Sequence, residues 1–305
     1  MKYPSYLNLS EKEFNSRIEK AKQLLNPCRV CPRKCGANRI KNEKGFCYLG
    51  NKAVVFSFEP GFGEEKALVG QYGSGAINFN FCNLSCAYCQ TYNISQLEKG
   101  RTVPGKEVSD KGLAKIMLKL QKSGCHNINL INPTSQVPQI LASLPYAIKE
   151  GLKIPLIYNT NTYDSVKTLK LLSGIIDIYL PDFKYSDEKM AVKYSQAPGY
   201  FKIAKKAIKE MHRQVGNLEI STDNLIKKGL LVRHLILPSN LAGSERVLKF
   251  LAKRISPNTF VNIMNRYNPC WQAKNFPEIN RYITTEEYKK VVDLAKNYNL
   301  KWFTE

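Results

Sequence analysis

The chain has 305 residues, of which 43% are hydrophobic and 23% charged, and this composition excludes a disordered or fibrous protein. Its apolar runs are short and its N-terminus has no signal-peptide pattern, so we expect a cytoplasmic protein without a membrane span. A net charge of +21 would suit an anionic partner, but the lysines are spread over many segments without interleaved aromatics, which favours a solvated surface.

The first part of the chain combines a helix, a cysteine-rich loop and a strand. Ser10-x-x-Glu13 is a capping box that opens an amphipathic helix. Residues 26–50 hold four cysteines among prolines and glycines, which suits a loop-built metal site better than a core element. Residues 52–58 are expected to form a strand, which leads into a glycine-rich segment at 61–63.

From residue 76 onward, apolar β-rich runs alternate with helical patterns. The expected strands are 76–81, 127–131, 155–159, 175–180, 230–237 and 260–264. Helices are expected behind an N-cap at Ser109, from Val137 to Glu150, from near Tyr163, over 202–211 and 244–255, and after the capping box Thr284-x-x-Glu287.

Strands that alternate with helices predict parallel βα units joined by right-handed crossovers. Six such units form either a doubly wound sheet or an incomplete barrel, because both share this local pattern. In both folds the functional groups gather at the carboxyl ends of the strands. We divide the chain into an N-terminal metal-binding segment, residues 1–70, and an α/β body, residues 71–305.

The most specific motif is Cys82-x3-Cys86-x2-Cys89, which directly follows the first strand of the α/β body. Thiolates are the ligands of iron–sulfur clusters, and a [4Fe–4S] cubane has four iron corners. Three cysteines on one loop can hold three corners and leave the fourth iron open to a substrate. A zinc knuckle would need a fourth ligand nearby, and the next several residues contain none.

This motif, with Tyr88 before its last cysteine, resembles the signature of the radical S-adenosylmethionine (SAM) superfamily. The wider sequence is similar to the activating enzymes of pyruvate formate-lyase, and more closely to an uncharacterised PflX-like group. The resemblance covers nearly the whole chain as an ordered set of segments, at 73–75, 89–95, 124–130, 158–161, 179–184, 232–234 and 264–267.

The resemblance implies a partial (β/α)6 barrel of the TIM type, with a [4Fe–4S] cluster on Cys82, Cys86 and Cys89 and with SAM and Tyr88 beside it. An electron from the cluster would cleave SAM to a 5′-deoxyadenosyl radical, which then removes hydrogen from a substrate. An electron donor such as ferredoxin or flavodoxin is also implied. The substrate stays open: a protein that receives a glycyl radical, a peptide, an RNA or a small molecule.

Residues at later strand ends are implied to contact SAM. Asp182 and Lys184 match an Asp-x-Lys that touches SAM and substrate, although a surface ion pair is the simpler alternative. Arg233 matches an arginine that contacts the SAM carboxylate. The family's Gly-Gly-Glu, which binds the SAM amine, is replaced here by Asn-Pro-Thr-Ser, where Asn132 and Thr134 offer uncharged oxygens for the same hydrogen bond.

Four further thiols lie within twenty residues, on Cys28, Cys31, Cys35 and Cys47. Such a set suits zinc or an iron–sulfur cluster, and a bound metal would make the segment fold. Three interpretations remain: a structural zinc or iron site, an auxiliary [4Fe–4S] cluster, or a zinc-ribbon contact for nucleic acid. The last is supported by four nearby basic residues, Arg29, Arg33, Lys34 and Arg39. We favour an auxiliary metal centre and leave its metal open.

The remaining candidates are weaker. Cys125 and Cys270 are isolated, and we expect both to be buried or inert. His234 lies within a strand, where a lone histidine is more often a satisfied core residue than a catalyst. The main alternative to a radical SAM enzyme is a metal-dependent nucleic-acid-binding protein without SAM chemistry.

Overall fold

The computed structural model describes residues 2–96 and 105–303. Its strands are β1 (Ala53–Gly61), β2 (Ser74–Phe79), β3 (Lys106–Val108), β4 (Ile128–Ile131), β5 (Leu156–Thr160), β6 (Ile178–Pro181), β7 (Glu219–Ile220), β8 (Ile226–Leu235), β9 (Phe260–Met264) and β10 (Lys301–Phe303). Its α-helices are α1 (Glu11–Gln23), α2 (Lys66–Val69), α3 (Tyr92–Ser95), α4 (Asp110–Lys122), α5 (Val137–Lys149), α6 (Val166–Leu171), α7 (Glu188–Ser195), α8 (Tyr200–Val215), α9 (Ser244–Arg254) and α10 (Thr285–Asn297).

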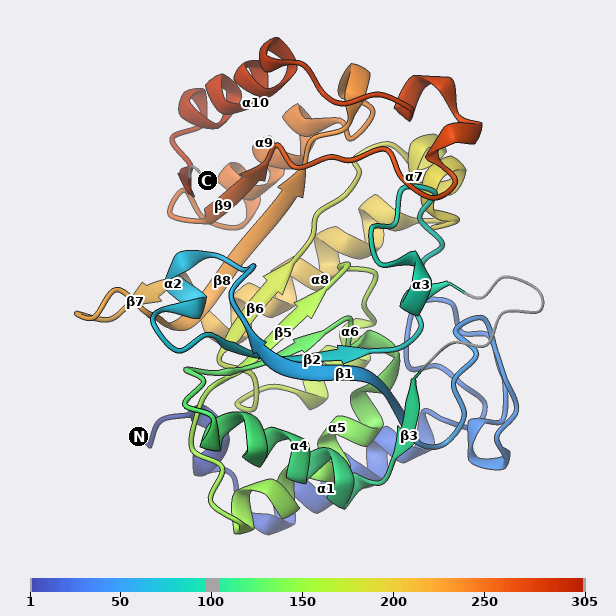
Figure 1. The fold of residues 1–305 in the computed structure, drawn as a ribbon, viewed down its shortest axis with the longest axis vertical. Helices are drawn as coiled ribbons and strands as arrows, with labels where there is room; N and C mark the ends of the chain where they lie inside the picture. The colour runs from blue at the N-terminus through green and yellow to red at the C-terminus, as the bar shows by residue number, and fades with distance from the viewer. Residues whose placement is uncertain (1, 97–104, 304–305) are drawn as a thin grey trace.

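The centre of the molecule is one large sheet whose main strands are parallel (Figure 1). Strands β2, β4, β5, β6, β8, β9 and β10 pair in chain order, each parallel to the one before it. At the other end β1 pairs antiparallel with β2, and β3 with β1. The strand order runs in one direction and does not reverse, as in an incomplete barrel and unlike a doubly wound sheet. The sheet is open, with β10 and β3 as its ends, and the predicted α/β fold class is confirmed.

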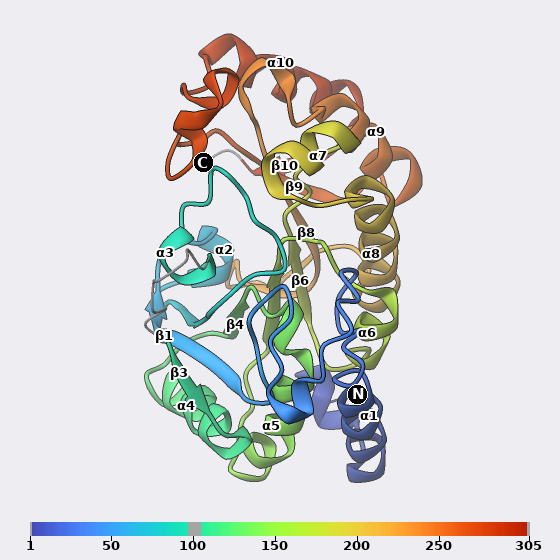
Figure 2. The same cartoon turned by 90° about the vertical axis from the view of Figure 1, so that its right-hand side faces the viewer.

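Helices cover the outer face of the sheet, with α6, α8 and α9 on the side opposite α2 (Figure 2). α8 shows why: it buries Ala204, Ala207, Ile208 and Met211 and turns most of its lysines to solvent, as the pattern over 202–211 predicts. α1 packs against α5 and begins with the predicted capping box of Ser10 and Glu13.

The inner face of the sheet has an apolar and a polar end. Leu68 of α2 packs in an apolar cluster on strands β5, β6 and β8, toward their amino ends. Side chains two residues apart on a strand share a face, so Asn159 follows Ile157 and Arg233 follows Leu231 on this inner side. α2 therefore covers the inner face toward the amino ends, and polar groups occupy it toward the carboxyl ends.

The cysteine-rich loop before β1 is attached to the sheet's helices by hydrogen bonds. Arg39 is fully buried, and its guanidinium donates to the carbonyl oxygens of Gly50 at 3.0 Å and of Ser135 at 2.7 Å. Thr168 on α6 donates to the carbonyl of Val30 at 2.6 Å. The division of the chain at residue 70 stays a prediction, while β1 itself belongs to the main sheet.

Some boundaries differ from the sequence-based expectation. The helix expected from near Tyr163 begins at Val166, because Tyr163 is buried and its hydroxyl donates to the carbonyl of Pro198 at 2.7 Å. The short elements α7 and β10 have too few residues to show a period. In the ranges 2–96 and 105–303, no helix has the length and apolar character needed to cross a bilayer.

Candidate metal centre and active site

Cys82, Cys86 and Cys89 lie between β2 and α3, in the segment that follows the carboxyl end of β2. Figure 1 shows how the chain runs from β2 to α3 at this edge of the sheet. The loop starts with Phe81 in the left-handed region, at φ 67°. Cys86 is buried, and the other two thiols are partly exposed. Repulsion by the charge of Cys89 adds to burial in raising the pKa of both Cys82 and Cys86.

Each of the three thiols has a polar partner. The side-chain amide of Asn161 donates to Cys82 Sγ at 3.2 Å, and Ser195 Oγ donates to Cys86 Sγ at 3.0 Å. Ser95 Oγ lies 3.1 Å from Cys89 Sγ. Asn161 directly follows β5, and Ser195 is the last residue of α7. Both are far from the cysteine motif in sequence, so the motif did not predict them. The hydrogen bonds suit thiolates, whose charge such donors stabilise.

The donor set fits an iron–sulfur cluster. Burial is the main reason that the pKa of Cys82 is raised and that the pKa of Cys86 is raised to about 12. A bound metal supplies the cation that a buried thiolate lacks, and soft thiolate ligands select iron–sulfur clusters over magnesium or calcium. No three Cys, His, Asp or Glu side chains of the described residues are already arranged around a metal-sized space. The assignment of these ligands stays a prediction.

Tyr88 lies in a buried chain of hydroxyl groups that ends at a cysteine. Its hydroxyl is 2.6 Å from that of Tyr185, which is 2.8 Å from Ser195 Oγ, the donor to Cys86. Burial raises the pKa of Tyr88 well above its usual value, so the phenol keeps its proton. The tyrosine expected beside the cofactor is therefore linked by hydrogen bonds through Tyr185 and Ser195 to the sulfur of Cys86.

The two uncharged candidates for the SAM amine lie in different surroundings. Asn132, at φ 57°, has its Oδ1 3.6 Å from Cys82 Sγ and donates through Nδ2 to the carbonyl of Phe81. Thr134 is 1% exposed, and its hydroxyl lies 2.9 Å from that of Thr160 in a separate buried network. Asn132 is thus the one that the structure brings to the thiols.

Asp182 and Lys184 form an ion pair of 2.8 Å at the end of β6, with side-chain exposures of 30% and 14%. Burial alone would lower the pKa of Lys184, but the attraction of Asp182, and then of Cys86, outweighs it and raises that pKa. The simpler alternative of an exposed surface pair does not fit this burial. Lys184 is a cation that faces both a carboxylate and the cysteine loop.

Arg233 on β8 is held by two carboxylates that the sequence did not point to. It pairs with Glu64 and Glu65, which lie between β1 and α2 and are some 170 residues away in sequence. Glu65 accepts from Arg233 Nε at 2.8 Å and from Nη2 at 2.6 Å. The sequence did contain a signal for this pairing, because the two adjacent glutamates directly follow the glycine-rich segment at 61–63. A contact of Arg233 with the SAM carboxylate stays a prediction, and its Nε and Nη2 already donate to these glutamates.

The N-terminal cysteines lie beside the central loop. Cys28, Cys31 and Cys47 are buried and Cys35 is exposed. A cavity of about 200 Å³ separates the two segments, lined by Cys47 from one and by Cys82 from the other. Arg33 Nε donates to the carbonyl of Asn83 at 2.8 Å and so joins them directly. A second metal centre at these four cysteines stays a prediction.

Two of the four basic residues that supported a nucleic-acid contact in this segment make their contacts inside the protein. Arg39 is fully buried, and the Arg33 guanidinium stacks 3.8 Å above the Phe46 ring. These two residues no longer support a zinc ribbon, because their guanidiniums make internal contacts, whereas Arg29 and Lys34 are exposed. Cys125 is buried as expected, whereas Cys270 is partly exposed and close enough for the charge of Cys89 to raise its pKa in addition to burial.

His234 is a satisfied core histidine, as expected. It is fully buried, with Nδ1 2.7 Å from the carbonyl of Phe183 and Nε2 2.8 Å from Ser244 Oγ. Because a carbonyl only accepts, Nδ1 carries the proton and Nε2 accepts from the serine. Burial lowers the pKa of His234 to about 4, so the ring is neutral at physiological pH.

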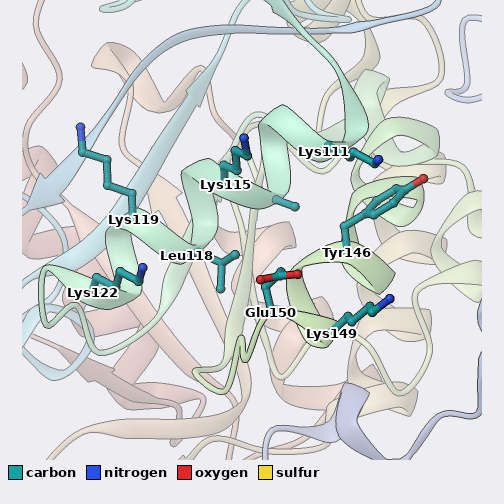
Figure 3. Close-up of a pocket in the computed structure, with 9 residues that line it drawn as sticks. Lys111, Lys115, Leu118, Lys119, Lys122, Tyr146, Lys149 and Glu150 are labelled. Atoms are coloured by element: carbon teal, nitrogen blue, oxygen red, sulfur yellow. The ribbon is translucent and has the colours of Figure 1, made fainter.

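A large groove lies away from the cysteines, between α4 and α5 (Figure 3). It has a volume of about 700 Å³ and is lined by Lys111, Lys115, Lys119, Lys122, Lys149, Tyr146 and a single carboxylate, Glu150, among other residues. The spread of lysines along the sequence hid this gathering, which the packing of two helices produces.

One relative by sequence is the uncharacterized protein MJ0674 of Methanocaldococcus jannaschii. It is 34% identical over 289 residues, which cover 93% of this chain and 78% of that protein. The chain belongs to the family of this archaeal protein. No protein-family model matches the present chain.

Among solved structures, a radical SAM methyltransferase from Sphaerobacter thermophilus matches with a TM-score of 0.50 and 9% identity, over 76% of this chain and 66% of that one. This likeness shows a shared fold. SuiB of Streptococcus suis, solved with S-adenosylmethionine bound, matches with a TM-score of 0.47 and 15% identity over 74% of this chain. The chain spans about half of SuiB, 48% of its length.

Proposed function

We propose that the chain is a radical SAM enzyme. The observation that carries this proposal is the placement of three thiols on one loop at the carboxyl edge of a parallel sheet. The Asp182–Lys184 ion pair follows the carboxyl end of β6 in the same sheet. The carboxyl edge is where open α/β sheets and barrels place their functional groups. The fold shared with a radical SAM methyltransferase supports the same class.

Cys82, Cys86 and Cys89 would hold a [4Fe–4S] cluster with an open iron for SAM. When bound, the reduced cluster supplies the electron that cleaves SAM, and the resulting 5′-deoxyadenosyl radical removes a hydrogen atom from the substrate. Asn161 and Ser195 keep the sulfurs oriented through their hydrogen bonds. A fourth thiol is not needed for this ligand set.

Asp182 and Lys184 would orient SAM at the strand ends. Because its pKa is raised, Lys184 remains charged and suits a carboxylate, while Asp182 holds its ammonium in place. Side chains behind the loop exclude water: Tyr88, Tyr185 and Tyr200 are all buried. A dry site protects a radical from solvent.

The finer assignment follows the sequence resemblance. A kinship with the pyruvate formate-lyase activating enzymes and the PflX-like group would make a protein glycine one candidate substrate, beside a peptide, an RNA or a small molecule. An electron donor such as ferredoxin or flavodoxin would supply the electron. The N-terminal cysteines would hold an auxiliary metal centre next to the catalytic one.

The test is anaerobic reconstitution with iron and sulfide, followed by dithionite and SAM. We expect the charge-transfer absorbance of an iron–sulfur cluster and the release of 5′-deoxyadenosine, measured by chromatography and mass spectrometry. A wild-type chain that takes up no cluster and forms no 5′-deoxyadenosine would sink the proposal.

The lysine groove favours a second candidate function, nucleic-acid binding. None of its five lysines forms an ion pair in the part of the chain that the structure describes. Neutralising Lys111, Lys115, Lys119 and Lys122 to Gln should weaken binding to a transfer-RNA mixture and flatten its salt dependence. The matched control removes the same charge from α8, at Lys202, Lys205, Lys206 and Lys209. Equal losses in both variants would point to net charge alone.

A further inference from the structure

The charges on the inner face of the sheet do not balance. Two carboxylates, Glu64 and Glu65, face one guanidinium, Arg233, and their side chains are 17%, 5% and 11% exposed. Asp182 is already matched by Lys184. One carboxylate in this group therefore has no cation of its own among the described residues. Burying such a charge is costly unless a ligand compensates it.

Glu64 is the carboxylate in excess. Glu65 takes both Nε and Nη2 of Arg233 and also accepts from Asn262 Nδ2 at 2.8 Å. Glu64 shares only Nη2 of that arginine. Its other oxygen accepts from the neutral amides of Asn129 at 3.0 Å and Asn159 at 3.2 Å. Three strands thus fix Glu64 in place while Glu65 uses most of the arginine.

A second observation at the same spot points to a ligand. Asn129 is 0% exposed, and its Oδ1 has no hydrogen-bond partner among the described residues. Its Nδ2 donates to Glu64, and both atoms belong to one planar amide, so the free oxygen lies next to the carboxylate. Buried acceptors nearly always have a donor, so the free oxygen of Asn129 calls for an N–H group. The excess negative charge of Glu64 beside it favours an N–H group that is positively charged.

The position fits a ligand that reaches down from the cysteine loop. Asn159 lies on β5, and Asn161, the donor to Cys82, follows directly after the end of that strand. Leu68 of α2 closes the inner face further down. A cationic group at Glu64 would therefore sit on the inner face of the sheet, between the strand end that holds Cys82 and the apolar cluster around Leu68.

We propose that Glu64 and Asn129 Oδ1 form a binding site for an organic ammonium group. Two molecules could bring that group: SAM through its amino acid end, or an amine-bearing substrate. The binding site itself does not depend on the proposed function, whereas the identity of these two ligands rests on it. Arg233 and Glu65 are then positioning residues that hold Glu64. The site supplies the charge that Asn132 and Thr134 lack.

The experiment measures binding by isothermal titration calorimetry to the full chain, before and after cluster reconstitution. Glu64→Gln keeps the shape and the acceptor for both asparagines but removes the charge. Glu59→Gln is the matched control, because Glu59 is exposed on β1 and the change in net charge is the same. Thermal unfolding checks that both variants fold.

The first arm uses SAM and 5′-methylthioadenosine, which lacks the amino acid end. If SAM brings the ammonium, Glu64→Gln binds SAM at least about tenfold more weakly, while 5′-methylthioadenosine binding is unchanged. The second arm uses the amines cadaverine, agmatine and spermidine. If the substrate brings the ammonium, Glu64→Gln leaves SAM binding unchanged and loses the affinity for these amines by a similar factor.

The site is overturned if Glu64→Gln and wild type bind SAM equally and the amines bind neither protein, or bind both equally. The proposed function fails differently, through a wild-type chain that takes up no cluster and forms no 5′-deoxyadenosine. The amine arm on the metal-free chain gives its answer in that case too.

Discussion

The two cysteine-rich segments hold their thiols in different surroundings. The central thiols receive hydrogen bonds from side chains of other βα units, such as Asn161 and Ser195. In the N-terminal segment, Cys28 packs in an apolar cluster with Leu24, Leu25, Val30 and Ala37. Burial is also the main cause that raises the pKa of Cys31 to about 12.

The central thiols are thus held by side-chain hydrogen bonds from other parts of the fold, whereas the N-terminal segment relies more on apolar packing. Hydrogen bonds to sulfur set the reduction potential of a cluster, and donors fixed on strands hold the ligands in one orientation. Cys28 and Cys31 receive backbone hydrogen bonds from within their own segment, at Val30 and Arg33. A metal bound there would stabilise a loop that has little core of its own. We therefore expect the central thiols to govern catalysis and the N-terminal thiols to govern the stability of their own segment.

The largest expected effect comes from removing one thiol in each segment. Cys86→Ala should abolish the formation of 5′-deoxyadenosine, because the cluster loses one of three ligands. Cys31→Ala, its matched partner from the other segment, should keep part of that activity and lose only the metal bound there. Iron and zinc analysis together with product chromatography measures both. Complete loss of activity in Cys31→Ala would remove the distinction between the segments.

Lys184→Met should have the next largest effect, since it removes the cation that faces the central thiols. Loss of a hydrogen bond to a charged group costs about 1.5–3 kcal/mol, or roughly 10- to 100-fold in kcat/KM for SAM. The raised pKa keeps Lys184 protonated as the pH rises through neutral values, so the loss should be the same at pH 6.5 and pH 9. A defect confined to low pH would assign the role to another group.

Local sequence patterns predicted the strands, the capping boxes and the central cysteines, because each depends on residues close together in the chain. The six predicted strands of the α/β body are apolar runs, and the cysteine motif spans eight residues, Cys82 to Cys89. The partners of these thiols come from elsewhere: Asn161 is 79 residues from Cys82 and Ser195 is 109 from Cys86. No spacing rule reports such contacts, since the sheet order creates them.

The pairing of Arg233 with Glu64 and Glu65 shows that ion pairs between distant residues are likewise not predicted by local sequence patterns. The sequence placed Arg233 at a strand end and expected a ligand there. The structure fills that place with carboxylates from the segment between β1 and α2, which lies on the inner face of the sheet. An inner-face segment outside the six βα units has no helical or strand period that marks it.

Asn161→Leu tests whether side-chain donors tune the central cluster. It removes the amide that donates to Cys82 Sγ at 3.2 Å, and we expect a lower reduction potential because the charge on sulfur is less stabilised. A redox titration followed by electron paramagnetic resonance measures the midpoint. Iron content serves as the control, since the three ligands remain. An unchanged midpoint would contradict the difference drawn between the two segments.

The smallest expected effect concerns the residue that joins the segments. Arg33→Met keeps an apolar contact with Phe46 but loses the hydrogen bond to the Asn83 carbonyl, worth about 1 kcal/mol. We expect a melting temperature lower by about 2–4 °C, measured by scanning calorimetry, and little change in the rate of SAM cleavage. Arg29→Met, at an exposed position nearby, is the matched control and should leave both unchanged. A large fall in SAM cleavage in Arg33→Met alone would show that the N-terminal segment acts on catalysis and not only on its own stability.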